Sequence, residues 1–177
     1  MKKLVSLALA AVLAVSAVGC GSNSDSSSST ADSAQSTEAA ADGAAFKIGG
    51  IGPITGGAAI YGQAVMNAAQ MAVDKINADG GINGYQVEFR FEDDEHDAEK
   101  SVNAYNTLKD WGMQMLMGTV TSTPCTAVVA KTAEDNMFQL TPSGSAVESI
   151  AQPNAFRVCF SDPNQGFASA QYIGENH

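Results

Sequence analysis

From residue 46 onward, short apolar runs alternate with longer segments whose apolar residues recur at helical spacing. The apolar runs predict five strands: FKIGGI (46–51), YQVEFRF (85–91), MQMLMG (113–118), MFQLT (137–141) and AFRVCF (155–160). The segments between them predict helices at 62–78, 97–111 and 123–136, a short one from Ser145, and a last one from Gln165. Strands that alternate with helices indicate an α/β fold, a doubly wound and mostly parallel sheet with helices on both faces.

Two of these elements have a regular pattern of apolar positions. In the helix 62–78 the apolar residues form one stripe, predicted to be buried: Val65, Ala68, Ala69, Ala72, Val73 and Ile76. In the strand 85–91 apolar and polar residues alternate strictly. Such alternation suits a strand with one solvent-exposed face, so this strand is predicted to lie at an edge of the sheet.

Capping residues predict where three helices begin. Asp97 is expected to cap the second helix. Thr123 is a good N-cap and is followed by Pro124, which suits a first helical position. Ser145 and Glu148 have the S-x-x-E spacing of a capping box.

The first 45 residues predict export rather than a folded core. Lys2 and Lys3 precede an apolar stretch that is too short to span a membrane and that ends just before Cys20. This pattern resembles a lipoprotein signal peptide, residues 1–20, in which Cys20 is acylated; a plain signal peptide is the alternative. Residues 21–45 are rich in Ser and Ala, which predicts a disordered tether. A lipid anchor with a tether would hold a domain just outside a membrane.

Charge and cysteine content narrow the possible partners. The formal net charge is −10 and no basic patch is visible, so nucleic acid is not an expected partner. Cys125 and Cys159 could form a disulfide or could be two buried thiols, and the sequence leaves both open. Cys and His do not have metal-ligand spacing, so neither a metal nor another cofactor is expected.

Three loops carry the candidate chemistry, because ligands of parallel sheets bind beyond the carboxyl ends of the strands. They are GPITGGAAIYG, GTVTST and TPSGS, and the last two place hydroxyls at helix starts. Helix N-termini bind anions, and since these loops lack Lys and Arg, a carboxylate fits better than a polyphosphate. The candidate ligand-binding residues are Tyr61, Ser122, Thr123, Ser143 and Ser145. The alternative is that Thr123 and Ser145 are only caps and that Tyr61 is a core aromatic.

Catalysis has little support in the sequence. His96 lies in the acidic run EDDEHD, which is read as a solvated connection capped by Asp97, and His177 is the last residue. The sequence contains neither a G-x-S-x-G elbow nor a P-loop lysine. The protein is therefore not expected to be an enzyme. An exported α/β hydrolase is an alternative that would need a base near Ser122.

Six motifs occur in an order that identifies a family. They are IGGIGPITGGAAIYG, AVDKINADGGINGYQVEF, EDDEHD, GTVTST, LTPSGS and FRVCFSDPNQG. From residue 46 to its end, the chain resembles the type I periplasmic binding proteins for branched-chain amino acids, the extracellular receptors of ABC importers. The resemblance implies that an amino acid binds between two lobes. Residues 46–177 would then be the N-terminal lobe, incomplete at its C-terminus, with the second lobe absent.

The resemblance also implies roles for four of the candidate residues. Ser122, with the amides of a helix N-terminus, looks like the hydroxyl that holds the ligand α-carboxylate. Ser143 sits where a backbone carbonyl receives the α-ammonium. Ser145 looks like the residue that contacts the polar end of the ligand through side chain and backbone. Tyr61 matches the aromatic residue of the first loop.

The function implied is that of a lipid-anchored, extracytoplasmic substrate-binding component of an ABC importer. Its ligand would be a branched-chain or similar hydrophobic amino acid, and its partner a permease in the cell membrane. The alternative within the same fold is a sensory ligand-binding domain for amides, urea or aromatic acids.

Overall fold

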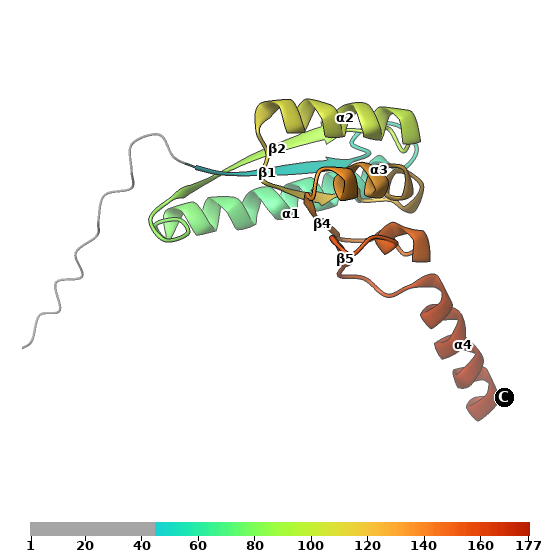
Figure 1. The fold of residues 1–177 in the computed structure, drawn as a ribbon. Coiled ribbons are helices and arrows are strands. Elements are labelled where there is room, and N and C mark those ends of the chain that lie inside the picture. The colour runs from blue at the N-terminus through green and yellow to red at the C-terminus, as the bar shows by residue number, and fades with distance from the viewer. Residues whose placement is uncertain (1–44) are drawn as a thin grey trace, which may run out of the picture. The chain divides into compact units, whose positions relative to one another are not determined.

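One parallel sheet organises residues 45–177, the part of the chain that the computed structural model describes. Its strands follow the order β2-β1-β3-β4-β5 (Figure 1). Their bounds are β1 Ala45–Gly52, β2 Gln86–Asp93, β3 Met115–Gly118, β4 Phe138–Thr141 and β5 Ala155–Arg157. The predicted α/β fold with a parallel sheet is confirmed, and β2 is an edge strand as expected. The predicted signal peptide, Cys20 and nearly all of the predicted tether lie outside the described residues.

In the described part of the chain, four α-helices and one 3-10 helix connect or follow the strands. Their bounds are α1 Ala59–Ala78, α2 Ala98–Trp111, α3 Ser122–Glu134, the 3-10 helix η1 Val147–Ile150 and α4 Asp162–Asn176. Figure 1 shows α1 and α2 on opposite faces of the sheet. Within residues 45–177, no helix combines the length and apolar character needed to cross a membrane.

Two helices begin three residues earlier than predicted. Helix α1 begins at Ala59 rather than Gly62, and its N-cap is Ala58, a residue with no capping side chain. Helix α4 begins at Asp162 rather than Gln165, because the Ser161 hydroxyl accepts a hydrogen bond from the amide of residue 164. The first of these starts carries no local sequence signal.

Two of the three predicted caps are wrong. The N-cap of α3 is Thr121, so that Thr123 lies exposed in the first turn. The N-cap of η1 is Ala146, so Ser145 and Glu148 form no capping box. The cap of α2 is confirmed, since the Asp97 side chain accepts a hydrogen bond from the Lys100 amide at 2.8 Å.

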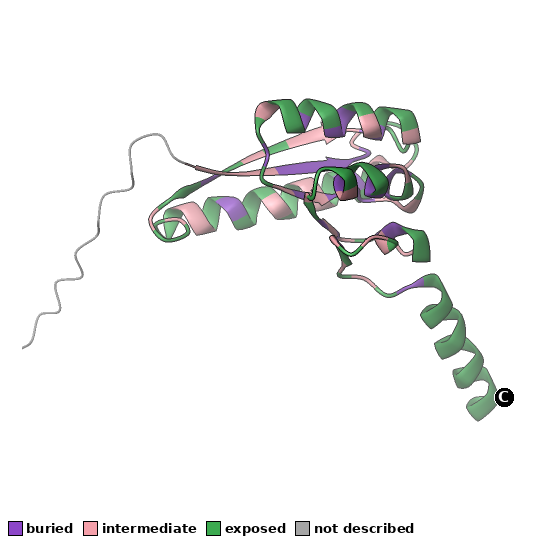
Figure 2. Cartoon of the chain, in the orientation of Figure 1, coloured by how far each residue is buried: buried purple, intermediate pink, exposed green. Residues whose placement is uncertain are grey.

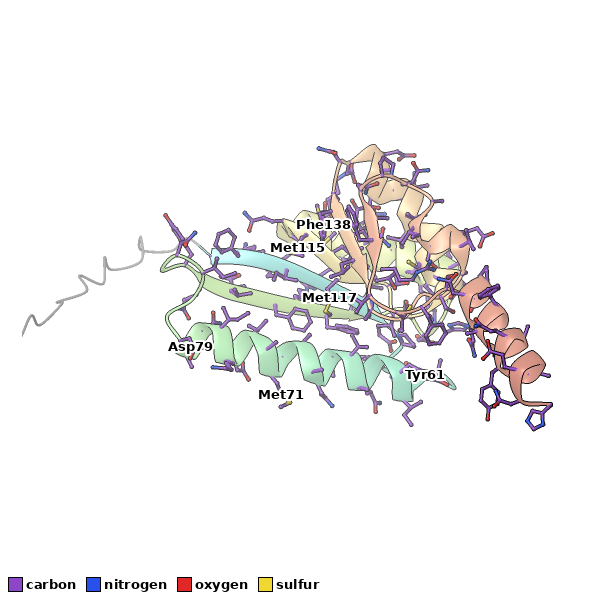
Figure 3. The ribbon with its side chains drawn as sticks, turned by 90° about the horizontal axis from the view of Figure 1, so that it is seen from below. Tyr61, Met71, Asp79, Met115, Met117 and Phe138 are labelled. Atoms are coloured by element: carbon purple, nitrogen blue, oxygen red, sulfur yellow. The ribbon has the colours of Figure 1, made fainter. Side chains whose placement is uncertain are left out.

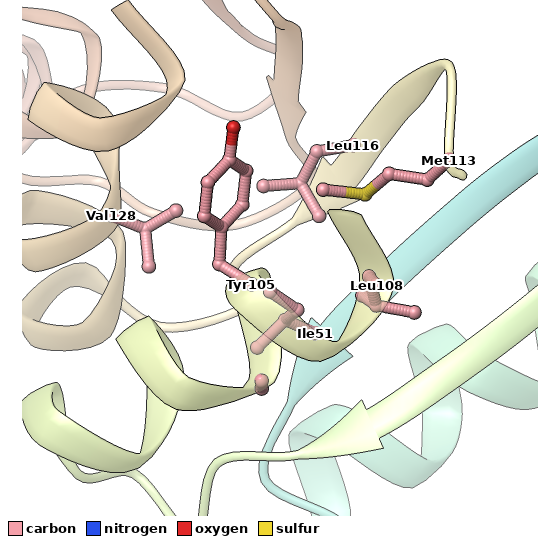
Figure 4. Packing of buried hydrophobic residues seen from close by; sticks show 7 residues of the cluster. Ile51, Tyr105, Leu108, Met113, Leu116 and Val128 are labelled. Carbon is pink, nitrogen blue, oxygen red and sulfur yellow. The ribbon is translucent and has the colours of Figure 1, made fainter. Parts of the chain in front are cut away.

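The main hydrophobic core lies between the sheet and helices α2 and α3 (Figures 2 and 4). Its buried members come from both layers: Ile51, Ala104, Tyr105, Leu108, Met113, Leu116 and Val128. Burial of these side chains supplies most of the hydrophobic stabilisation on this face. The core therefore fixes α3, the helix whose start carries two of the candidate residues, against α2.

Tyr105 is the one core residue with a polar end. Its hydroxyl donates a hydrogen bond to Asp135 at 2.8 Å, and Asp135 also pairs with Lys109. Burial, together with this carboxylate, raises the pKa of Tyr105 far above its ordinary value. The Tyr105 hydroxyl therefore stays protonated and acts as a hydrogen-bond donor at the edge of the core.

We expect Tyr105→Phe to lower the free energy of unfolding by about 1 kcal/mol, because it removes this hydrogen bond and keeps the ring. Urea denaturation measures the change. Tyr172→Phe is the matched control, since Tyr172 is exposed on α4. Equal stability of Tyr105→Phe and the parent would show that the bond contributes nothing.

The predicted stripe of α1 is only partly buried. Val73 is buried and three other members are half-buried, but Ala68 and Ala72 are exposed. Helix α1 packs on β1 and β2 at one edge of the sheet, so its contact stripe is narrow. In β2 the predicted alternation holds, with Val87 buried and its polar neighbours exposed.

The two cysteines of the described residues do not form a disulfide. Cys125 is buried in α3, Cys159 is half-buried, and both are free thiols. Cys159 was predicted to lie within the strand 155–160, but β5 ends at Arg157, so Cys159 lies beyond it. The last rung of the ladder is the hydrogen bond from the Val158 amide to the Thr141 carbonyl, at 3.1 Å. Of the two alternatives, the disulfide is wrong.

The sheet face away from the core carries apolar side chains on its central and outer strands. Figure 3 shows Met115, Met117 and Phe138 there, beside the region that α1 covers. The rings of Phe138 and Phe156 stack with centroids 5.3 Å apart, yet they are 40% and 49% exposed. Within the described residues this part of the sheet has no covering layer.

Candidate functional site

Two hydroxyl-bearing loops meet at the carboxyl edge of the sheet, beside the end of β1. The strand order places β1, β3 and β4 side by side, so the loops that follow them are neighbours. The Val120 amide donates to the Ile51 carbonyl at 3.0 Å. The Ser143 hydroxyl donates to the Val120 carbonyl at 2.5 Å, and the Ala146 amide donates to Ser122 Oγ at 3.2 Å. The predicted residues Ser122 and Ser143 are thereby brought together.

Three of the helices that begin at this edge, within the described residues, have no side-chain caps. The N-caps of α1, α3 and η1 are Ala58, Thr121 and Ala146, and none makes a side-chain capping hydrogen bond. By contrast, α2 and α4 are capped by Asp97 and Ser161. The first-turn amides of a helix without a cap need another acceptor. The start of α3 therefore presents donors that an anion could satisfy, whereas the amides of Ala59 and Tyr61 in α1 already donate to loop carbonyls.

Ser122 adds a hydroxyl to the start of α3. Its oxygen accepts the hydrogen bond from the Ala146 amide, and a hydroxyl also has one proton to donate. Within the described residues that proton has no assigned acceptor. Thr123 is exposed in the same turn. A carboxylate is the group that would accept from both the hydroxyl and the first-turn amides.

Ser143 and Ser145 differ in what their backbones do. The Ser143 hydroxyl is used between the loops, and its carbonyl accepts no hydrogen bond within residues 45–177. The Ser145 carbonyl accepts from the Asp162 amide at 3.1 Å, which joins the loop to the start of α4. The role predicted for the Ser143 carbonyl is compatible with this geometry.

Tyr61 lies apart from the core. Its side chain is 62% exposed near the start of α1 (Figure 3), which rules out the core-aromatic alternative. Within the described residues no hydrogen bond joins Tyr61 to the serine loops. Its part in the site remains a prediction.

Two further residues at this edge were not among the predicted site residues. Arg157, the last residue of β5, donates from Nη1 to the carbonyls of Gly144, Ser145 and Ala146, at 3.4, 2.9 and 2.9 Å. His96 Nδ1 lies 2.9 Å from Thr121 Oγ1, a hydrogen bond that ties the acidic run to the start of α3. The loops themselves lack Lys and Arg as predicted, but a neighbouring strand brings in a guanidinium.

The acidic run does more than connect β2 to α2. The Asp93 carboxylate accepts hydrogen bonds from the Ile54 amide at 2.9 Å and from the Thr55 hydroxyl, and so holds the loop after β1. Burial alone would raise the pKa of Asp93, but these bonds outweigh it and the pKa is lowered. Asp94 is fully buried, and burial raises its pKa to about 6. The reading of this run as solvated is therefore wrong for Asp94.

No metal cluster marks the serine loops in the part of the chain that the structure describes. Among the described residues, no group of three or more His, Cys, Asp or Glu side chains could hold a metal ion. A hollow of about 710 Å³ runs along α4, and its lining includes Phe160, Ala168 and Tyr172 but none of the five candidate residues. The groups that the candidate site offers are thus hydroxyls and amides.

This architecture is that of a small-molecule binding fold: a parallel sheet with helix starts and hydroxyls at its carboxyl edge. A family profile described as "Periplasmic binding protein" matches residues 45–177. The chain belongs to the periplasmic binding protein family.

Several named relatives share the matched region. The Leu/Ile/Val-binding protein BraC3 of Rhizobium johnstonii is 36% identical over 131 residues, which are 73% of this chain and 36% of that protein. The leucine-, isoleucine-, valine-, threonine- and alanine-binding protein of Pseudomonas aeruginosa is 32% identical over 133 residues, 74% of this chain and 36% of that protein. The chain thus spans about a third of the length of these relatives, which are binding proteins rather than enzymes.

Solved structures agree in fold. The branched-chain amino acid transporter substrate-binding protein LivJ of Streptococcus pneumoniae, in complex with isoleucine, has a TM-score of 0.70 and is 30% identical, covering 75% of this chain and 39% of that one. The leucine-binding protein LivK of Thermotoga maritima has a TM-score of 0.66 and is 26% identical, covering 74% and 37%. The family resemblance seen in the sequence is confirmed, while the roles of individual ligand-binding residues stay predictions.

Proposed function

We propose that the protein is the extracytoplasmic substrate-binding component of an ABC importer and that its ligand is a branched-chain or similar hydrophobic amino acid. The names of its relatives and the isoleucine complex of LivJ support the ligand class. The observation that carries the proposal is Ser122 at the uncapped start of α3, with its oxygen already accepting a hydrogen bond from the neighbouring loop.

In this proposal each end of the amino acid meets its own set of groups. The α-carboxylate accepts from the Ser122 hydroxyl and from the first-turn amides of α3, where the helix dipole favours negative charge, with Thr123 beside it. The α-ammonium donates to the Ser143 carbonyl. Ser145 contacts the polar end of the ligand, and Tyr61 lies over it from α1. The captured amino acid is then presented to a permease in the membrane.

The test is a thermal-shift screen of the mature protein, expressed from its complete reading frame, against the twenty amino acids. A ligand at one hundred times its Kd adds about 2.7 kcal/mol to the stability of the folded state. A rise in Tm with leucine, isoleucine or valine supports the proposal. If no amino acid raises Tm, the ligand class is wrong, and amides, urea and aromatic acids are the next panel.

We expect Ser122→Ala to weaken amino-acid binding about tenfold, because it removes a hydrogen bond to a charged carboxylate. Isothermal titration with the amino acid that gives the largest thermal shift measures the loss. Thr107→Ala is the matched control, since the Thr107 hydroxyl only bonds its own helix backbone on the exposed surface of α2. An unchanged affinity in Ser122→Ala would reduce this serine to a structural residue that links two loops.

The proposed location rests on the N-terminal segment. Residues 1–20 are proposed to be a lipoprotein signal peptide, with Cys20 acylated, and the tether to follow as far as β1; Ala45, predicted as its last residue, already belongs to that strand. We expect Cys20→Ala to shift the protein from the membrane fraction to the soluble or secreted fraction. Retention in the membrane fraction would contradict lipid anchoring.

A further inference from the structure

Arg157 makes an unusual set of contacts with the loop that carries Ser145. A single guanidinium nitrogen, Nη1, faces three successive backbone carbonyls, those of Gly144, Ser145 and Ala146. This nitrogen has two protons, which match the two contacts of 2.9 Å, and the third contact is longer at 3.4 Å. Three parallel carbonyl dipoles repel one another unless a cation or several donors face them. Arg157, together with the Asp162 amide that also donates to the Ser145 carbonyl, therefore holds a backbone arrangement that the loop would not keep alone.

The same contacts set the direction of the loop amides. In a planar trans peptide, the carbonyl of one residue and the amide of the next point in opposite directions. With the carbonyls of residues 144–146 directed at Arg157, the amides of Ser145, Ala146 and Val147 point away from it. The Ala146 amide does so, because it donates to Ser122 Oγ at 3.2 Å. The amides on either side of it have no acceptor within residues 45–177.

We propose that Arg157 is a positioning residue of the ligand site. It directs the amides of Ser145 and Val147 to the side on which the Ser122 hydroxyl lies, so that the three donors converge on one carboxylate. Arg157 itself touches the loop and not the ligand. This inference rests on the proposed function for the identity of the anion, but the orientation of the loop can be tested without any ligand.

The first experiment measures the loop alone. Amide hydrogen exchange of Ala146 is followed by NMR in the protein from the complete reading frame and in its Arg157→Met and Arg157→Lys variants. We expect Arg157→Met to speed this exchange about tenfold or more, because the bond to Ser122 is no longer held. Arg157→Lys retains a cation with three donors and should fall between. Unchanged protection in both variants overturns the proposal.

The second experiment measures binding, with L-leucine, L-isoleucine and L-valine as probes. We expect Arg157→Met to weaken the affinity about tenfold, and Arg157→Lys to weaken it less. In the parent protein the amide signals of Ser145 and Val147 should shift on saturation, and in Arg157→Met these shifts should shrink. Arg90→Met, which removes a partly exposed cation paired with Glu92 on β2, is the control and should leave the affinity unchanged.

The outcomes separate the possible failures. A purely structural role for Arg157 would lower Tm while leaving the affinity and the ligand-induced amide shifts unchanged, and that result overturns the proposal. If Arg157→Met does not fold, the Arg157→Lys variant decides. Parent-like amide exchange and affinity in that variant would mean that the planar guanidinium group is not needed to orient the loop. If the parent binds none of the three probes, the proposed function fails, while the exchange experiment still tests whether Arg157 orients the loop.

Discussion

Replacing Gly62 by alanine is expected to lower the free energy of unfolding by about 3 kcal/mol or more. A Cβ on Gly62 would lie 1.9 Å from the carbonyl oxygen of Pro53 and 2.5 Å from its carbonyl carbon. Both atoms belong to the backbone of the loop after β1, so no side chain can rotate away. The first turn of α1 would have to move off the sheet, and this movement would carry Tyr61 with it.

The matched control for this prediction is Gly57→Ala in the same loop. A Cβ on Gly57 would meet no atom within 4 Å, so its effect should stay within about 0.5 kcal/mol. Urea denaturation of both variants measures the difference. Equal stability of the two variants would mean that α1 can shift at no cost. In that case the close approach of α1 to this loop would not be a constraint on the site.

The strands and helices could be predicted because their apolar spacing is local. Strand β2 shows this best, since its strict alternation predicted both a strand with one solvent-exposed face and its place at the edge of the sheet. The prediction failed for β5, where VCF continues the apolar run but the strand ends at Arg157. An apolar run shows which residues can be buried. Where a strand ends, however, depends on whether the adjacent strand still offers backbone hydrogen-bond partners.

Helix starts were predicted well only where a side chain makes the cap. Asp97 bonds its own helix and was identified correctly. Thr123 and Ser145 have capping residue types but do not cap, because the chain turns into α3 at Ser122 and into η1 at Val147. At these starts the sequence shows hydroxyls that could cap, and only the structure shows that the amides are left without them.

For the same reason, only part of the site could be predicted from the sequence. Ser122 and Ser143 each follow a strand, so a general rule for parallel sheets brought them to one edge. Arg157 and His96 act through contacts with Ala146 and Thr121, which lie 11 and 25 positions away along the chain. No local pattern marks such pairs. A cation at the end of β5 could have been noticed by asking which side chains the next strand brings to that edge.

Asp94 gives the second large prediction, a pH dependence of stability. Its side chain is fully buried; one carboxylate oxygen accepts from the His96 amide at 2.9 Å, and the other has no hydrogen-bond partner in the structure. Burial raises its pKa most, the negative charges of Asp93 and Asp97 raise it further, and the His96 amide and ring act in the opposite direction. The result is a pKa of about 6, against an ordinary value of 3.8.

Between these two pH values the folded state keeps a proton on Asp94 that the unfolded chain has lost. The free energy of unfolding should therefore fall as pH rises from about 4 to about 6, by an amount on the order of 3 kcal/mol, and stay level above that. Asp94→Asn should remove this fall, because Asn keeps an oxygen for the His96 amide and carries no charge to bury. Above pH 6 the variant should be more stable than the parent, by somewhat less than the fall itself, since the new Nδ2 donor is buried without a partner.

Urea denaturation at steps between pH 4 and pH 8 measures both curves. Asp110→Asn is the control, since Asp110 is exposed on α2 and its change to Asn should leave the slope of the parent intact. Parallel curves for Asp94→Asn and the parent would show that Asp94 is ionised in the folded protein, with a partner for its second oxygen. A curve that flattens only in Asp94→Asn assigns the proton to this carboxyl, which lies directly after the Asp93 carboxylate that holds the first loop of the site.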